Sequence, residues 1–205
     1  MSGHCVFLDL RIELDNAITY GTKAAAAKIA RKALEKAQAA SAGAEEEYFR
    51  GQIEMLRGNH SAAIKHFDAA IKLNPADGAA FNDRALCMIE LGIIDKAFPY
   101  FDKGIEVEPD YANVYHNKGW LLNNIGRHRE AIACFKKALE LEPERPVTYD
   151  NLADALYNLQ DYGGALKAYK KVLELLKPGI CRQIRKQIGI KIKQIEKKLN
   201  SALNP

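Results

Sequence analysis

Apolar and small residues recur at an interval of 34 residues through most of this chain, and within each interval their spacing is helical. Ala131, Phe135 and Ala138, for example, stand four and three residues apart, so they share one face of a helix. The recurring columns are Gly51, Ala85, Gly119 and Ala153; Gly58, Gly92 and Gly126, with Gln160 in the fourth place; Ala63, Ala97, Ala131 and Ala165; Phe67, Phe101, Phe135 and Tyr169; and Pro75, Pro109 and Pro143, with Pro178 one residue late. The pattern predicts four pairs of helices.

The residue types in these columns explain why each interval should fold as two helices. The small residue lets the two helices cross closely, and the glycine ends the first helix. Proline then stops the second helix, because it has no N–H to donate and its ring clashes with the preceding turn. Pro99 lies inside the second helix predicted for the second unit, where we expect it to kink this helix or to delay its start.

This spacing and residue pattern resemble the tetratricopeptide repeat family over about residues 44–179. The resemblance implies an all-α fold, a right-handed α-solenoid of helix-turn-helix repeats, in which the first helices line a concave groove that receives a segment of a partner. Repeats are expected at 44–77, 78–111, 112–145 and 146–179. A single pair of short helices cannot bury its apolar face alone, so each repeat is expected to be completed by its neighbours.

The segments outside the repeats are expected to cover the two ends of the solenoid. In 1–43, the alternation of apolar and charged residues over 8–14 indicates a strand, whereas the stripe of Phe7, Leu10 and Leu14 indicates a helix. We expect the helix, because no second strand is predicted to pair with a first one. A further helix at 23–40, capped by Thr22, would complete a degenerate repeat.

The last segment, 180–205, is predicted to form a capping helix over about 180–199. Its apolar stripe comprises Ile184, Ile188, Ile192, Ile195 and Leu199, and its basic residues are Arg182, Arg185, Lys186, Lys191, Lys193, Lys197 and Lys198. With Glu196 these give the helix a net charge of +6, so the rest of a chain with a total of +4 carries −2. The positive charge therefore belongs to the C-terminal helix.

Composition places the protein among globular chains, with 48% hydrophobic and 27% charged residues. No apolar run approaches the roughly 20 residues that a membrane-spanning helix needs. The first residues lack the pattern of a secretory signal, so we expect a cytoplasmic protein without a membrane span. Four scattered cysteines, Cys5, Cys87, Cys134 and Cys181, lack metal-ligand spacing, and we interpret Cys87 and Cys134 as small packing residues.

No arrangement of residues in the sequence indicates catalysis. The five histidines, His4, His60, His66, His116 and His128, do not combine with cysteines or carboxylates at metal-ligand spacing, and glycine-rich phosphate loops are missing. We therefore expect a non-enzymatic protein that uses no cofactor and no metal.

Binding is better supported, because the first helices of the repeats are rich in asparagine. In the third repeat Tyr115, Gly119 and Leu122 form the packing stripe, so residues displaced around the helix should face away from the core. Asparagine is a mediocre helix former, but its amide donates and accepts hydrogen bonds, as a bound peptide backbone requires. The partner-binding residues predicted in this way are Asn82, Asn113, His116, Asn117, Trp120, Asn124, Asp150, Asn151, Asp154 and Asn158.

Two interpretations of these residues stay open. Asn117 and Asn151 resemble the asparagine ladder by which some family members hold a peptide, although Phe49 and Asp83 replace asparagine in the first two repeats; ordinary solvated helix surface is the alternative. Trp120, the only tryptophan, would anchor a partner or fill space between neighbouring first helices.

The charge of the predicted groove indicates the chemistry of the partner. Some family members bind carboxylate tails of chaperones through a basic clamp, but Asp83, Asp150 and Asp154 make this groove acidic, so a positively charged segment fits better. Two alternatives come from other classes of function: an adaptor that binds RNA or another polyanion through the basic C-terminal helix, and a self-associating structural module.

Overall fold

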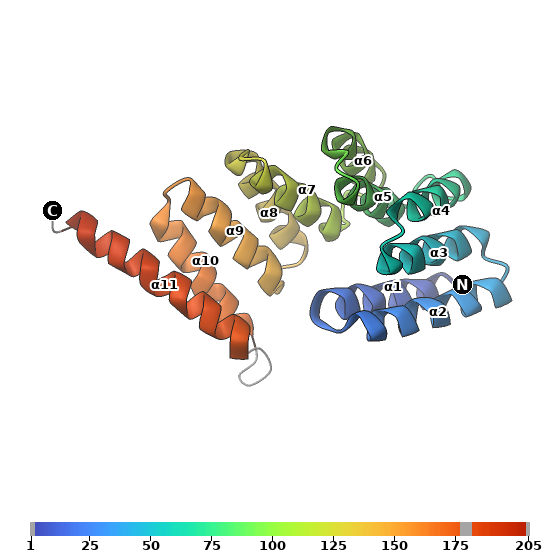
Figure 1. Cartoon of the computed structure of the whole chain (residues 1–205), viewed down its shortest axis with the longest axis horizontal. Coiled ribbons are helices and arrows are strands. Elements are labelled where there is room, and N and C mark those ends of the chain that lie inside the picture. Colours follow the sequence, from blue (N-terminus) through green and yellow to red (C-terminus); the bar gives the residue numbers. More distant parts are fainter. Residues whose placement is uncertain (1–2, 177–181, 204–205) are drawn as a thin grey trace. The chain divides into compact units, whose positions relative to one another are not determined.

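The computed structural model describes residues 3–176 and 182–203, and in these residues every regular element is an α-helix (Figure 1). The fold is an all-α solenoid of helix pairs, which confirms the predicted class. The helices group into two compact units, Met1–Pro109 and Asp110–Pro205. Among the described residues no helix is long and apolar enough to cross a membrane.

The first unit contains six helices. They are α1 (Gly3–Tyr20), α2 (Lys23–Ala39), α3 (Gly43–Arg57), α4 (His60–Leu73), α5 (Gly78–Glu90) and α6 (Ile94–Val107). The helical interpretation of the first segment is thus confirmed, and Thr22 caps α2 as predicted, its hydroxyl oxygen accepting a hydrogen bond from the Ala25 N–H at 3.2 Å. Leu10 and Leu14 of α1 are buried. They make α1 part of the core of this unit.

The second unit contains five helices. They are α7 (Ala112–Asn124), α8 (His128–Leu141), α9 (Pro146–Asn158), α10 (Tyr162–Leu175) and α11 (Arg182–Leu203). Ile188, Ile192 and Ile195 of α11 are buried in a cluster with residues of α9 and α10, as predicted for a capping helix. Ile184 is 44% exposed, so its assignment to the buried stripe was wrong. Pro178 and Cys181 lie outside the described residues.

Close crossings and left-handed turns define the helix pairs. The position predicted to need a small residue does need one: a Cβ at Gly119 would lie 2.9 Å from the Phe135 ring, and one at Gly51 would lie 2.6 Å from that of Phe67. Each first helix of the repeats is followed by a residue with positive φ. These residues are Gly58 (85°), Gly92 (75°), Gly126 (83°) and, in the fourth repeat, Gln160 (63°).

Pro99 lies within α6, five residues after the helix begins at Ile94. Of the two expected effects of this proline, a delayed helix start is excluded and a kink stays a prediction. A proline at this position removes one backbone hydrogen bond, to the carbonyl of Asp95, while the remaining residues continue the helix.

Cys87 is buried, as its interpretation as a packing residue predicts, and burial raises the pKa of its thiol to about 12. Cys134 is half-buried.

Candidate functional site

Nine of the ten predicted partner-binding residues lie in the second unit, five on α7 and four on α9. Only Asn82, on α5, lies in the first unit. The candidate site is therefore built from two neighbouring first helices of one compact unit. We call it the α7–α9 surface; its predicted members are Asn113, His116, Asn117, Trp120, Asn124, Asp150, Asn151, Asp154 and Asn158.

His116 is buried, so the prediction that it faces away from the core was wrong. Its Nδ1 lies 2.9 Å from the Thr148 hydroxyl oxygen, and its Nε2 accepts a hydrogen bond of 3.4 Å from the Asn151 amide. Burial, together with the positive charge of Arg145, lowers the pKa of His116 to about 3. The ring is therefore neutral, with Nδ1–H donating to Thr148, and it joins α7 to α9.

The carboxamides around His116 connect this buried contact to the surface. Asn151, which donates to His116, is half-buried, and Asn117 is half-buried as well. Asn113 donates to the Tyr111 hydroxyl at 3.0 Å and accepts a hydrogen bond from Arg145. These contacts orient the amides on the α7–α9 surface.

Trp120, Asn124 and Asn158 are exposed on the same two helices. The Trp120 side chain is 37% exposed, which leaves part of the indole ring accessible to a partner. An accessible indole beside amide groups can contact an apolar side chain while the amides bond to backbone. In chemical terms, this surface can bind a polypeptide but contains no nucleophile with an adjacent base.

The acidic pair on α9 already has a cationic partner within the chain. Lys191 of α11 donates to Asp150 at 3.2 Å and to Asp154 at 2.9 Å, and its Nζ lies 5.0 Å from the centre of the Tyr169 ring. Tyr169 also donates a hydrogen bond to Asp154. Two carboxylates therefore share one internal lysine, which compensates part of their negative charge. Selection of a positively charged partner by these aspartates stays a prediction.

Two other cations of α11 are also used within the second unit. Arg185 donates to the carbonyls of Leu173 and Leu176, at 2.7 and 2.8 Å, and so satisfies the C-terminal end of α10. Lys198 donates to the Tyr162 hydroxyl at 3.3 Å and lies 4.8 Å from the centre of the Tyr157 ring. Among the described residues, Arg182, Lys186 and Lys193 are basic residues of α11 that are exposed and make no such contact.

In the first unit, Asn82 is buried, so the prediction that it faces outward toward a partner was wrong. Its amide donates to Asp83 at 2.8 Å, and Asp83 also accepts hydrogen bonds from the Tyr48 hydroxyl, at 2.9 Å, and from Gln52. Burial raises the pKa of Asp83 to about 7, with a further contribution from the charge of Asp15. This polar cluster joins α3 to α5.

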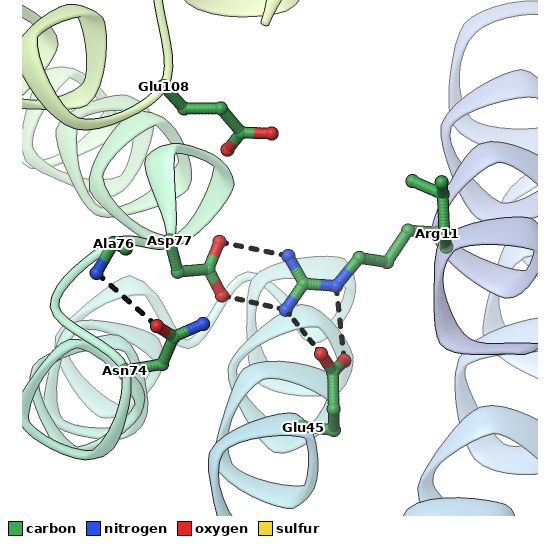
Figure 2. Close-up of a pocket in the computed structure, with 7 residues that line it drawn as sticks. Arg11, Glu45, Asn74, Ala76, Asp77 and Glu108 are labelled. Atoms are coloured by element: carbon green, nitrogen blue, oxygen red, sulfur yellow. Dashed lines mark hydrogen bonds and ion pairs between the residues drawn. The ribbon is translucent and has the colours of Figure 1, made fainter. Parts of the chain in front are cut away.

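A pocket of about 140 Å³ lies at one edge of the first unit, between α1, α3 and the start of α5 (Figure 2). Figure 2 shows the Arg11 guanidinium bridging Glu45 and Asp77. The four hydrogen bonds between them are 2.7–3.1 Å long. The guanidinium also lies 3.7 Å from the centre of the Tyr48 ring. The role of Arg11 could not be predicted from the sequence, because its partners are distant in the chain and belong to other elements.

Arg11 has a structural role in this pocket. Asp77 caps α5 by accepting the Ala80 N–H at 3.0 Å while it binds Arg11, so one carboxylate ties α1 to the start of α5. Among the described residues, no group of three histidines, cysteines or carboxylates is arranged to hold a metal ion.

Comparison with known proteins identifies the class that these helix pairs define. Models of the tetratricopeptide repeat match residues 50–112, 112–145 and 146–177, which together span well over half of the chain. The chain belongs to the tetratricopeptide repeat family. A comparison with curated proteins gave no match.

Several solved structures share this fold. TTC0263, a thermophilic tetratricopeptide protein of Thermus thermophilus, superposes with a TM-score of 0.69 at 18% identity, over 91% of this chain and 96% of that one. MamA gives a TM-score of 0.60 at 21% identity, over 79% and 93%. YrrB, a tetratricopeptide protein with an unusual peptide-binding site, gives 0.58 at 19%, over 88% of each chain. The fold and the family membership together support a general role as a protein-interaction scaffold.

Proposed function

We propose that the chain is a non-enzymatic adaptor that holds a segment of a partner protein on the α7–α9 surface. The observation that supports this proposal most strongly is the grouping of accessible amides with the exposed Trp120 on two adjacent first helices. Asn117 and Asn151 occupy equivalent positions 34 residues apart, so their amides repeat from one repeat to the next. Trp120, on the same surface, supplies an apolar contact for the partner.

The proposed mechanism uses each residue type for a different part of the partner. Asn117 and Asn151 donate to backbone carbonyls and accept from backbone N–H groups, which fixes the path of the segment without requiring a particular sequence. Trp120 packs against one apolar side chain and supplies most of the selectivity, since large aromatic residues dominate interface energies. His116 stays buried and neutral, and it positions Asn151 through their hydrogen bond.

The test is affinity capture from a lysate of the source cell, in which the native chain is compared with the triple variant Asn117→Ala, Trp120→Ala and Asn151→Ala. A matched control carries Lys136→Ala, Lys137→Ala and Glu140→Ala, three substitutions on α8, outside the proposed surface. All three proteins must first show equal helicity by circular dichroism. We expect partners that the native chain and the control retain and that the triple variant loses.

Equal capture by the native chain and the triple variant would contradict the proposal. Loss in the α8 control but not in the triple variant would move the binding surface to the second helices of the repeats. A photo-crosslinker at position 120 provides a direct check, because a partner on this surface must form an adduct there.

A further inference from the structure

The orientation of α11 follows from three sets of contacts with its own unit. Ile188, Ile192 and Ile195 enter the core formed with α10, and Arg185 binds the carbonyls at the end of that helix. On its next side, α11 faces α9. There Lys191 meets Asp150 and Asp154, and Lys198, two turns later, meets Tyr157. The contacts follow the same order along both helices, so α9 and α11 run parallel, as Figure 1 also shows.

The ion pair between Asp154 and Lys191 places carboxamides on both sides of this contact. Asn151 and Asn158 stand three residues before and four residues after Asp154 on α9. Gln187 and Gln194 stand four residues before and three residues after Lys191 on α11. Residues at these spacings are neighbours on a helix surface. Because the helices are parallel, Gln187 of α11 should be level with Asn151 of α9, and Gln194 of α11 with Asn158 of α9.

This spacing and the parallel direction of the helices imply two rows of carboxamides across three helices of the second unit. One row is Asn117, Asn151 and Gln187, and the other is Asn124, Asn158 and Gln194. Both glutamines are exposed, as are Asn124 and Asn158. Equivalent positions of α9 and α11 are 36 residues apart, two more than the repeat interval. A residue 34 positions after Asn158 is the buried Ile192, so the repeat interval alone does not identify the glutamines.

The negative charge between these rows is partly compensated within the protein, because one lysine serves two carboxylates. Asp150 and Asp154 share Lys191, whose Nζ lies within 3.2 Å of both carboxylates. The hydrogen-bonding groups presented on either side are neutral amides. A segment that carries lysine or arginine thus gains less from the aspartates than it would without Lys191, and one that carries carboxylates meets them at close range.

We propose that α11 is the third wall of the partner-binding surface, and that this surface takes an extended polypeptide segment without formal charge in its contacting stretch. The inference rests on the proposed function and extends it from two helices to three. Amides of Gln187 and Gln194 bond to the backbone of the segment beyond α9. Ile190, which is 49% exposed beside them, offers a contact for one apolar side chain.

A random-peptide display library, panned against the full chain, tests this inference. We expect enriched peptides that are uncharged over their shared stretch. Affinity of one such peptide, measured by fluorescence anisotropy, should fall about tenfold in the variant Gln187→Ala with Gln194→Ala, as expected when two hydrogen bonds are lost. The matched control, Lys186→Ala with Lys193→Ala, changes exposed residues of the same helix and should retain the affinity.

A second variant examines the internal neutralisation. Lys191→Met keeps much of the side-chain stem but leaves Asp150 and Asp154 without their cation, so panning against it should enrich lysine- and arginine-containing peptides. If the native chain already enriches basic peptides, or if both glutamine substitutions leave affinity unchanged, the inference is overturned. Acidic peptides that are lost with Lys186→Ala and Lys193→Ala would overturn it too, in favour of the basic face.

The outcomes separate this inference from the proposed function. If Asn117→Ala with Asn151→Ala abolishes peptide binding while the glutamine variant binds normally, the α7–α9 surface stands and α11 has no part in it. If neither variant affects binding, or if no peptide is enriched, both proposals fail.

Discussion

Asp83 shows how one buried carboxyl group can make the first unit sensitive to pH. Its pKa is raised to about 7 in the folded chain, chiefly by burial, whereas in the unfolded chain it should lie near its ordinary value of about 3.9. The folded state therefore binds the proton more tightly. The contribution of Asp83 to the free energy of unfolding is therefore fully present below the unfolded pKa and is lost as pH rises through about 7, by up to about 1.4 kcal/mol per pH unit.

Replacing this carboxyl group should remove that dependence. We expect Asp83→Asn to unfold with a midpoint in urea that changes much less than the native midpoint between pH 5 and pH 8. Asp102→Asn, at an exposed carboxylate of the same unit, is the control and should keep the native pH dependence. An unaltered slope in Asp83→Asn would show that Asp83 does not carry the effect.

The burial of His116 and Asn82 could not be predicted from the sequence. Both are polar and are displaced around the helix from the packing stripe of their own helix, from which exposure was predicted. Their burial depends on residues that helical spacing does not identify as partners, such as Thr148, which is 32 residues from His116. Periodicity describes one helix at a time, whereas the polar contacts form between helices.

At the scale of an element, the turn between α9 and α10 lacks the glycine found in the other repeats. Gln160 adopts φ of 63° where Gly58, Gly92 and Gly126 have φ between 75° and 85°. A left-handed conformation costs a residue with a Cβ roughly 1–2 kcal/mol, whereas glycine loses more entropy on folding. The net effect of Gln160→Gly should be a stabilisation of about 0.5–1 kcal/mol.

Thermal unfolding followed by circular dichroism measures this change. Gln160→Gly should raise the Tm by about 1–4 °C. Gln160→Ala keeps the Cβ and is the control, which should not share the increase. A lower Tm for the glycine variant would mean that the glutamine side chain contributes more stability than its backbone conformation costs.

The helices themselves were predictable, because a strict interval identifies equivalent positions without knowledge of any contact. The described helices of the four repeats fall where the columns of small, aromatic and proline residues indicate them. The role of α11 was not predictable in the same way. Positions of α11 lie 36 residues after the equivalent positions of α9, so they depart from the 34-residue interval. Its lysines predict an exposed basic face, whereas in the structure Lys191 binds α9 and Lys198 binds α10.

Beyond single elements, helices that follow one another in the chain pack together within each unit, as expected for a repeat protein. A defect at one end should therefore spread only as far as neighbouring interfaces transmit it. Ile195 of α11 is 1% exposed and belongs to the cluster that includes Ala165, Tyr169 and Val172 of α10. Truncating it removes packing from that interface, at a cost of about 2–4 kcal/mol.

Hydrogen exchange can show where this cost is felt. In Ile195→Ala, amides of α10 and α9 should exchange faster than in the native chain, whereas those of α2, α3 and α4 should be unchanged, because stability in repeat proteins is nearly a sum of local terms. Ile190→Ala is a matched control: the same substitution on the same helix, at a side chain that is 49% exposed, should cost less than about 0.5 kcal/mol. Uniformly faster exchange in α2 to α10 would instead mean that the chain unfolds as one cooperative body. In that case α11 would govern the stability of the whole molecule and not only that of its own end.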